Sequence, residues 1–412
     1  MVLGGRRRRS FWVTLAACLS LPAAGVLASS GSSALGSSTR SAASRFDPRS
    51  VTFISADSGW VLGTTPCGAG GACLGLRETT DAGRAWVAQP LPAALVAAAD
   101  RKVAGVVADL YDGGGLNVRF ADTRDGWIYG SLPVSAQREC AGCVNLEPTL
   151  WSTHDGGAVW HKQPLSGLGS YEQIFDLEAS GGTAYLMATN DAQGVSVKSS
   201  PVTEDHWQLA DTPRLGDPAG GGEQSGAFVL QGASGWLVEG NDRGTTGSAQ
   251  LDEGQWVSWT PPCASLGGSF AIPAAASARN LVAVCVMGGF ASPLPKSAPP
   301  GAKLGSSWLY FSSNGGQSFV AGPELAPGTP WFSVLASPTP RSILIGRGIG
   351  NSQELAASFD GGVHWTVVYH GQPLYLAFTT PRQGVAIVGS LSGPTKLIMT
   401  FDGGQRWTAV SF

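Results

Sequence analysis

Six cysteines lie beyond the N-terminal segment, and their spacing limits the chemistry that they can do. An even number of cysteines is typical of disulfide-bonded proteins outside the cytosol. The sequence does not fix the pairing, but the pairs that close the shortest loops are 67–73, 140–143 and 263–285. The six residues are Cys67, Cys73, Cys140, Cys143, Cys263 and Cys285.

The pair Cys140-Ala-Gly-Cys143 also has the spacing of redox and zinc sites. A thioredoxin-type redox site needs its first cysteine at the start of a helix, and no helical pattern surrounds this pair. A zinc site needs a second such pair, or two histidines at matching spacing, and the sequence offers neither. We therefore expect a disulfide that closes a loop, and we expect neither a metal nor a cofactor.

Acidic and arginine side chains scattered along the chain could form a glycan-cleaving site. Glycoside hydrolysis needs two carboxylates about 5–10 Å apart across a cleft. The sequence selects no pair of acids and gathers no arginines around one pocket, so catalytic residues stay unassigned. Most of these acids are typical of solvated turns. The acids are Asp109, Asp112, Glu139, Glu147, Asp176, Glu178 and Glu239, and the arginines are Arg119, Arg214, Arg243, Arg347 and Arg382.

One pattern, Ser/Thr-x-Asp-x-Gly-x-x-Trp, recurs five times and organises the chain. In the third copy Asn replaces Asp and Phe replaces Trp. Segments 204–207 and 252–256 keep an acidic residue and the tryptophan, and we interpret them as decayed copies. The acid, glycine and aromatic positions are Asp81, Gly83 and Trp86; Asp155, Gly157 and Trp160; Asn314, Gly316 and Phe319; Asp360, Gly362 and Trp365; and Asp402, Gly404 and Trp407.

The aromatic residues of these copies lie about fifty residues apart, which suits a four-stranded propeller blade. Upstream of a copy, two β runs flank a turn, as in Val51–Phe53 followed by Gly59–Gly63. Val118–Phe120 followed by Gly126–Gly130 repeats this arrangement. The sequence therefore predicts an all-β fold over residues 47–412, a seven-bladed β-propeller of four-stranded antiparallel blades.

Within each copy we expect the aspartate to be structural rather than catalytic. Its carboxylate can accept hydrogen bonds from the amides of a turn. The glycine supplies a positive φ in the hairpin. The tryptophan packs back onto the sheet, where its burial contributes about 2–3 kcal/mol.

Residues 1–28 resemble an export signal, because Arg6–Arg9 precede a long apolar run. Three interpretations stay open. The signal is cleaved, with Arg8-Arg9 suited to a twin-arginine receptor, or Cys18 is lipidated, or the segment is an uncleaved anchor. Residues 29–46, rich in Ser, Gly and Ala, are predicted to be a flexible tether. We expect a secreted or cell-envelope protein that meets the membrane only through its N-terminal segment.

Composition narrows the choice of partners. The net charge is −3, and basic residues are scattered beyond the N-terminus. Nucleic-acid binding needs a concentrated basic face, so we expect no nucleic-acid partner. The abundance of alanine and glycine, with arginine in excess over lysine, favours a GC-rich bacterial source. We expect a monomer.

The repeated pattern resembles the Asp-box, or BNR repeat, of sialidase-like propellers. In that superfamily these hairpins lie at the blade periphery, away from the central channel, which implies the structural role stated above. Asp-box proteins include sialidases, xyloglucan hydrolases, sortilin-type receptors and photosystem II assembly factors, so the resemblance does not decide function. A sialidase would show an Arg-Ile-Pro element in its first blade, three arginines and a Tyr/Glu pair, whereas this blade opens with Phe46-Asp47-Pro48-Arg49.

The Gly-Trp pairs before second strands look closer to photosystem II assembly-factor-like and uncharacterised secreted bacterial propellers. This resemblance implies a non-catalytic platform that binds a protein partner on a propeller face. The alternative is a glycan-directed protein, which would be a sialidase-like or other glycoside hydrolase or a lectin. Opposed carboxylates at one mouth of the channel would favour the hydrolase. A face without such carboxylates would favour the platform.

Overall fold

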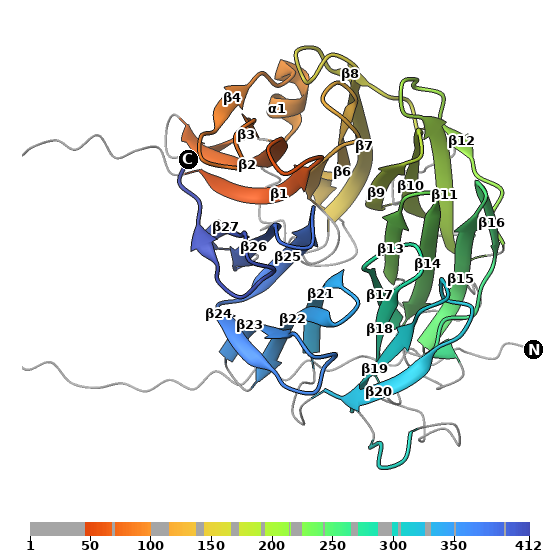
Figure 1. The fold of residues 1–412 in the computed structure, drawn as a ribbon. Coiled ribbons are helices and arrows are strands. Elements are labelled where there is room, and N and C mark those ends of the chain that lie inside the picture. Colours follow the sequence, from red (N-terminus) through yellow and green to blue (C-terminus); the bar gives the residue numbers. More distant parts are fainter. Residues whose placement is uncertain are drawn as a thin grey trace, which may run out of the picture. The chain divides into compact units, whose positions relative to one another are not determined.

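Seven antiparallel sheets of four strands each follow one another along the chain (Figure 1). The computed structural model describes residues 46–67, 71–99, 115–136, 144–165, 173–190, 194–213, 215, 225–241, 244–264, 271–286, 299–303, 306–325, 331–349, 352–390 and 393–412. Each sheet uses four consecutive strands in up-and-down order and is one blade. The predicted seven-bladed, all-β propeller of four-stranded antiparallel blades is confirmed.

The strands are numbered in chain order, four to a blade. Blade 1 comprises β1 (Asp47–Phe53), β2 (Gly59–Cys67), β3 (Gly71–Thr79) and β4 (Val87–Gln89). Blade 2 comprises β5 (Leu116–Phe120), β6 (Gly126–Ala136), β7 (Val144–Thr153) and β8 (His161–Lys162). Blade 3 comprises β9 (Ile174–Ser180), β10 (Thr183–Asn190), β11 (Gly194–Pro201) and β12 (Gln208–Leu209). Blade 4 comprises β13 (Ser225–Gln231), β14 (Ser234–Asn241), β15 (Gly244–Asp252) and β16 (Gln255–Ser258).

Blade 5 comprises β17 (Ala271–Ala275), β18 (Leu281–Val286), β19 (Ser307–Ser312) and β20 (Val320–Glu324). Blade 6 comprises β21 (Trp331–Thr339), β22 (Ser342–Ile349), β23 (Ser352–Ser358) and β24 (Thr366–His370). Blade 7 comprises β25 (Pro373–Phe378), β26 (Gly384–Gly389), β27 (Thr395–Thr400) and β28 (Thr408–Ala409). One seven-residue helix, α1 (Ala93–Ala99), follows blade 1 and buries Leu95.

The hydrophobic core lies between neighbouring blades. Trp60 on β2 is fully buried, and its ring stacks on Phe120 of blade 2 with 3.8 Å between the ring centroids. Leu62 of blade 1 and Ile128 of blade 2 belong to the same cluster. Burying a large aromatic side chain contributes about 2–3 kcal/mol. Each blade therefore depends on its neighbours for stability, as in other repeat proteins.

Glycine is required in the Gly-Trp pairs for a steric reason. A Cβ atom at Gly59 would lie 2.7 Å from the ring of Phe53, the residue opposite it on β1. Gly126 lies against Phe120 in the same way, at 2.5 Å. The large residue that ends the first strand thus requires glycine at the start of the second.

The third and fourth strands of blade 7 are joined by the turn that contains Asp402. The Asp402 carboxylate accepts hydrogen bonds from Thr400 Oγ1 at 2.9 Å and from the amides of Gln405 and Arg406 at 3.0 Å. Trp407 Nε1 donates to the carbonyl of Gly404 at 3.1 Å. The aspartate therefore holds the turn amides while the indole closes the hairpin.

The same contacts recur at the turns of Asp81, Asp155 and Asp360. The hydrogen bond from the Ala85 amide, followed by the one from Thr79, lowers the pKa of Asp81 below its ordinary value. These carboxylates are committed to their own turns, so we propose that they are structural.

Blade 5 replaces the closing indole with one from the preceding blade. Phe319 has no N–H to donate, and Trp259 Nε1 donates to the carbonyl of Gly316 at 2.9 Å instead. Trp236 Nε1 donates to the neighbouring carbonyl of Gly315 at 3.1 Å. The hydrogen bonds that close this hairpin therefore also bind blade 4 to blade 5.

Two of the three expected disulfides are present, Cys67–Cys73 and Cys263–Cys285. The third expected pair, Cys140 and Cys143, lies outside the described residues, as do Cys18 and the predicted signal. Disulfides are typical of an oxidising compartment outside the cytosol. Within the part of the chain that the structure describes, no helix is long and apolar enough to span a membrane.

The first and last blades lie side by side. The rings of Phe46 and Phe412 lie 4.7 Å apart. Arg49 Nη2 donates to the carbonyl of Gly393 at 3.1 Å. Gln383 Nε2 donates to the carbonyl of Ala56 at 2.7 Å. Side chains close this ring, because among the described strands neither blade takes one from the other.

Deleting residues 407–412 should destabilise the whole protein. The deletion removes Trp407, outer strand β28 and Phe412, and losing such aromatic contacts costs about 3–5 kcal/mol each. We expect a single melting transition at a clearly lower temperature, measured by circular dichroism. The exposed substitution Ser411→Ala is the control. Unchanged melting of the truncated protein would contradict closure by these contacts.

Candidate functional site

The first strand of each blade borders a cavity of about 720 Å³ in the middle of the propeller, called here the channel mouth. Figure 1 shows these strands, such as β13, β17, β21 and β25, on the inner side of their blades. Blades 4, 5 and 6 supply an almost entirely apolar wall. It includes Ala227, Phe228, Val229, Leu230, Pro273, Ala274, Ala275, Leu335 and Ala336.

Polar side chains gather on the opposite wall, which we call the arginine–acid cluster. Its members are Arg119 of β5, Tyr129 of β6, Asp176 and Glu178 of β9, and Tyr375 of β25. Arg119 Nη2 donates to Glu178 Oε1, and its Nε donates to the carbonyl of Leu177 at 3.1 Å. Tyr129 Oη donates to Asp176 Oδ1 at 3.1 Å. Three blades therefore hold one guanidinium beside two carboxyl groups.

Burial governs the protonation of this cluster. It raises the pKa of Glu178 to about 7, although Arg119 opposes the shift. Burial also raises the pKa of Asp176, again against Arg119. Burial and then the charge of Asp176 raise the pKa of Tyr129, which therefore stays a neutral donor. The cluster thus has a carboxyl group that titrates near neutral pH.

The two carboxyl groups lie on one strand, at alternate positions of β9. They are neighbours and do not face each other across the cavity. Within the described structure Asp176 accepts hydrogen bonds only through Oδ1 and Glu178 only through Oε1, so each carboxyl group keeps one oxygen without a protein donor. The cluster can therefore accept further hydrogen bonds from a bound molecule.

The other acids that the sequence singled out lie elsewhere. Glu239 of β14 is fully buried, and burial raises its pKa to about 7, against the Val195 amide. Glu147 is exposed beside Lys162. The remaining three lie outside the described residues; they are Asp109, Asp112 and Glu139.

The arginines do not converge on one point within the described ranges. Arg119 borders the channel mouth. Arg347 is buried in an ion pair with Glu354, with 2.8 Å between Nη2 and Oε1. Arg382 is exposed, and Arg214 and Arg243 lie outside the described residues. Sequence reasoning did not select Tyr129 and Tyr375 for this site. The one signal for them is the alternation of side chains along a strand, which gives the face of the sheet but not the residues of other blades that meet there.

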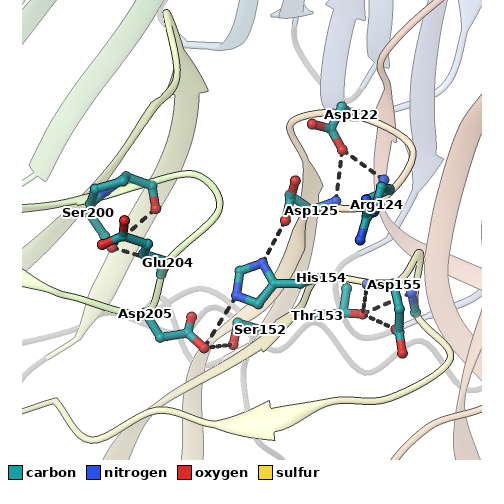
Figure 2. A network of polar contacts seen from close by, with 12 residues as sticks. Asp122, Arg124, Asp125, Ser152, Thr153, His154, Asp155, Ser200, Glu204 and Asp205 are labelled. Carbon is teal, nitrogen blue, oxygen red and sulfur yellow. Dashed lines mark hydrogen bonds and ion pairs between the residues drawn. The ribbon is translucent and has the colours of Figure 1, made fainter.

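A second polar cluster joins blades 2 and 3 (Figure 2). His154 Nδ1 lies 2.6 Å from Asp125 Oδ1, and His154 Nε2 lies 3.4 Å from Asp205 Oδ2. Ser152 Oγ and Gln163 Nε2 donate to the same Asp205 oxygen at 2.8 and 2.7 Å. Asp205 belongs to the decayed copy of the repeat in blade 3. Its carboxylate binds the neighbouring blade in place of its own turn.

This histidine should make stability depend on pH. Burial lowers the pKa of His154, but the hydrogen bond that its ring donates to Asp125 and then the charge of Asp205 outweigh burial, so the pKa is raised above 6.5. The stabilisation is therefore complete below pH 6.5 and is lost as the pH rises through the folded-state pKa. We expect His154→Asn to cost about 1 kcal/mol at pH 6 and less at pH 9, measured by urea unfolding.

The matched control for this prediction is His206→Asn, an exposed histidine on the turn that also carries Asp205. This substitution leaves the contacts of His154 in place. An equal loss at pH 6 and pH 9 for His154→Asn would rule out an ionic contact between the blades.

No protein-family model and no curated protein sequence match the chain. Among solved structures it is similar to YCF48 bound to a D1 peptide, with a TM-score of 0.51 and 18% identity over 87% of this chain and 94% of that one. It is also similar to YCF48 from Cyanidioschyzon merolae, with a TM-score of 0.52 and 13% identity over 87% and 97% of the two chains. An ulvan lyase of polysaccharide lyase family PL25 gives a TM-score of 0.51 and 11% identity over 90% and 97%. These similarities show a shared β-propeller fold.

Proposed function

We propose that this protein is an exported, non-catalytic binding platform that holds a segment of a partner protein in its channel mouth. The observation that carries this proposal is the two-sided lining of the cavity. Apolar side chains of blades 4 to 6 face the arginine–acid cluster of blades 2, 3 and 7. Binding sites commonly combine an apolar lining with a few placed polar groups.

The arrangement of the acids supports a binding role over hydrolysis. A hydrolase places its two carboxyl groups on opposite sides of the bond that it cleaves. Here Asp176 and Glu178 are neighbours on β9 and are held by Tyr129 and Arg119. Such a cluster can orient a ligand on one side of the cavity.

Two further observations agree with this proposal. The similar YCF48 structure contains a peptide, so a propeller of this kind can bind a protein segment. The two disulfides and the basic, apolar N-terminal segment support an exported protein. The platform would then act outside the cytosol, in the cell envelope or beyond it.

A glycan-directed role is the second candidate, and the chemistry of Glu178 favours it. A carboxyl group with a pKa near 7 is suited to general acid catalysis. It shares its wall of the cavity with two tyrosines, Tyr129 and Tyr375. A similar solved structure is a polysaccharide lyase, so the fold accommodates such a substrate.

Filling the channel mouth should weaken partner binding. Peptides would be selected from a displayed random library on residues 46–412 and then titrated by calorimetry. Ala227 lines the apolar wall, so we expect Ala227→Trp to weaken their binding at least about tenfold, because the indole occupies the cavity. Ala233→Trp is the matched control, since Ala233 lies exposed on the turn after the same strand.

Equal binding by Ala227→Trp and the wild type would place the peptides elsewhere and contradict the proposal. Polysaccharides would be incubated with the wild type and with Glu178→Gln, and the products analysed by mass spectrometry. Cleavage products from the wild type alone would establish the glycan-directed enzyme instead.

A further inference from the structure

The hydrogen-bonding capacity of the arginine–acid cluster is unevenly used. Arg119 donates to Glu178 and to the Leu177 carbonyl, and it is hydrogen-bonded to Tyr375. Three protein acceptors therefore already hold its guanidinium, and they use three of its five N–H donors. An anionic ligand that displaced Glu178 from Arg119 would break an existing ion pair and leave a partly buried carboxylate without its cation.

The carboxyl groups are in the opposite situation. Asp176 Oδ1 accepts from Tyr129 and from the Leu177 amide, whereas no hydrogen bond involves Oδ2 in the described structure. Glu178 accepts from Arg119 through Oε1, and Oε2 likewise has no donor there. Two carboxyl oxygens beside one cavity thus lack protein donors in the described structure, and they can accept hydrogen bonds from water or from a ligand that replaces it.

The charged residues that border the channel mouth also favour a cationic ligand. Arg119, Asp176 and Glu178 are the charged residues that border the channel mouth within the described ranges. One guanidinium faces two carboxyl groups, so the site carries a net negative charge when both are ionised. A bound cation would neutralise this negative charge. It would also form charge-assisted hydrogen bonds, which are stronger than hydrogen bonds between neutral groups.

The opposite wall suits the stem of a long cationic side chain. Val229, Ala275 and Leu335 line it with apolar atoms. Lysine and arginine side chains lay their methylene stems along apolar surface and place the charged head among polar groups. A side chain of this kind would therefore contact both walls of the channel mouth.

We propose that the channel mouth binds one lysine or arginine side chain of the partner, with its charged head on Asp176 and Glu178 and its stem on the apolar wall. This inference rests on the proposed function, because the cation belongs to the bound protein segment. It names the chemical class that the platform recognises.

Binding of the cation releases a proton from the two acids. The groups that face Glu178 are Arg119 from β5, Tyr129 from β6, Asp176 from β9 and Tyr375 from β25. A cation adds to the effect of Arg119 and favours the ionised carboxylate. Since the pKa of Glu178 in the free protein is about 7, affinity for the cation should rise between pH 6 and pH 8.

The test uses acetylated and amidated five-residue alanine peptides with one variable central residue. The central residue is lysine, arginine, norleucine or glutamate, and binding to residues 46–412 is measured by calorimetry at pH 6 and pH 8. We expect the lysine and arginine peptides to bind at least about tenfold more tightly than the norleucine peptide. The difference should be larger at pH 8.

Two variants remove the acids without changing their shape. Glu178→Gln and Asp176→Asn should each weaken binding of the lysine peptide about tenfold and leave the norleucine peptide unchanged. Circular dichroism and melting confirm that each variant folds. Glu239→Gln is the matched control, because Glu239 is a buried acid on β14 that does not border the channel mouth.

Equal affinity for the lysine and norleucine peptides, or tighter binding of the glutamate peptide, would overturn this inference. Those outcomes leave the platform itself standing, because the library peptides of the preceding experiment would still bind and still be excluded by Ala227→Trp. Failure of the library peptides to bind at all would instead contradict the proposed function.

Discussion

Packing between blades is the interaction on which the rest of this structure depends. Each sheet has two apolar faces, and both are covered only by the neighbouring blades. Stacking of Trp60 on Phe120 shows the scale of one such contact. Because the first and last sheets have the same need, Phe46, Trp86 and Phe412 gather where blades 1 and 7 meet. The ring and its inner cavity follow from this requirement.

Local contacts explain why the fold could be predicted from the sequence. The turn at Asp402 is held by residues within four positions of the aspartate, and Gly59 is required by a phenylalanine six positions earlier. Such contacts leave a pattern of fixed spacing that repeats in every blade that retains them. The two confirmed disulfides also join residues that are close in sequence.

The candidate site could not be predicted in the same way. Arg119, Asp176 and Tyr375 are far apart in the sequence and meet only because the ring closes. Asp176 and Glu178 were among the acids that the sequence singled out, yet nothing local distinguished them from solvated turn residues. Tyr129 lies on an ordinary second strand, and its role depends on a neighbour in the next blade. Burial, which raises the pKa of Glu178, is likewise a property of the assembled ring.

Where a copy of the repeat departs from the pattern, its contacts are of a different kind. In blade 5 the loss of an indole at Phe319 is offset by Trp259 from blade 4. In blade 3 the acid of the repeat, Asp205, faces His154 of blade 2. In both places a hydrogen bond between two blades stands where the regular copies make one within a blade. These substitutions preserve the ring, on which the channel mouth depends.

The most direct test of the channel mouth as the binding site is a crystal structure of residues 46–412 with a bound peptide selected for affinity. We predict that the peptide enters the cavity and places a basic side chain against Asp176 and Glu178. Its remaining contacts should lie on the apolar wall formed by blades 4 to 6. A peptide bound to the outer strands or to the turns that contain the repeated aspartates, with the cavity unoccupied, would contradict this account.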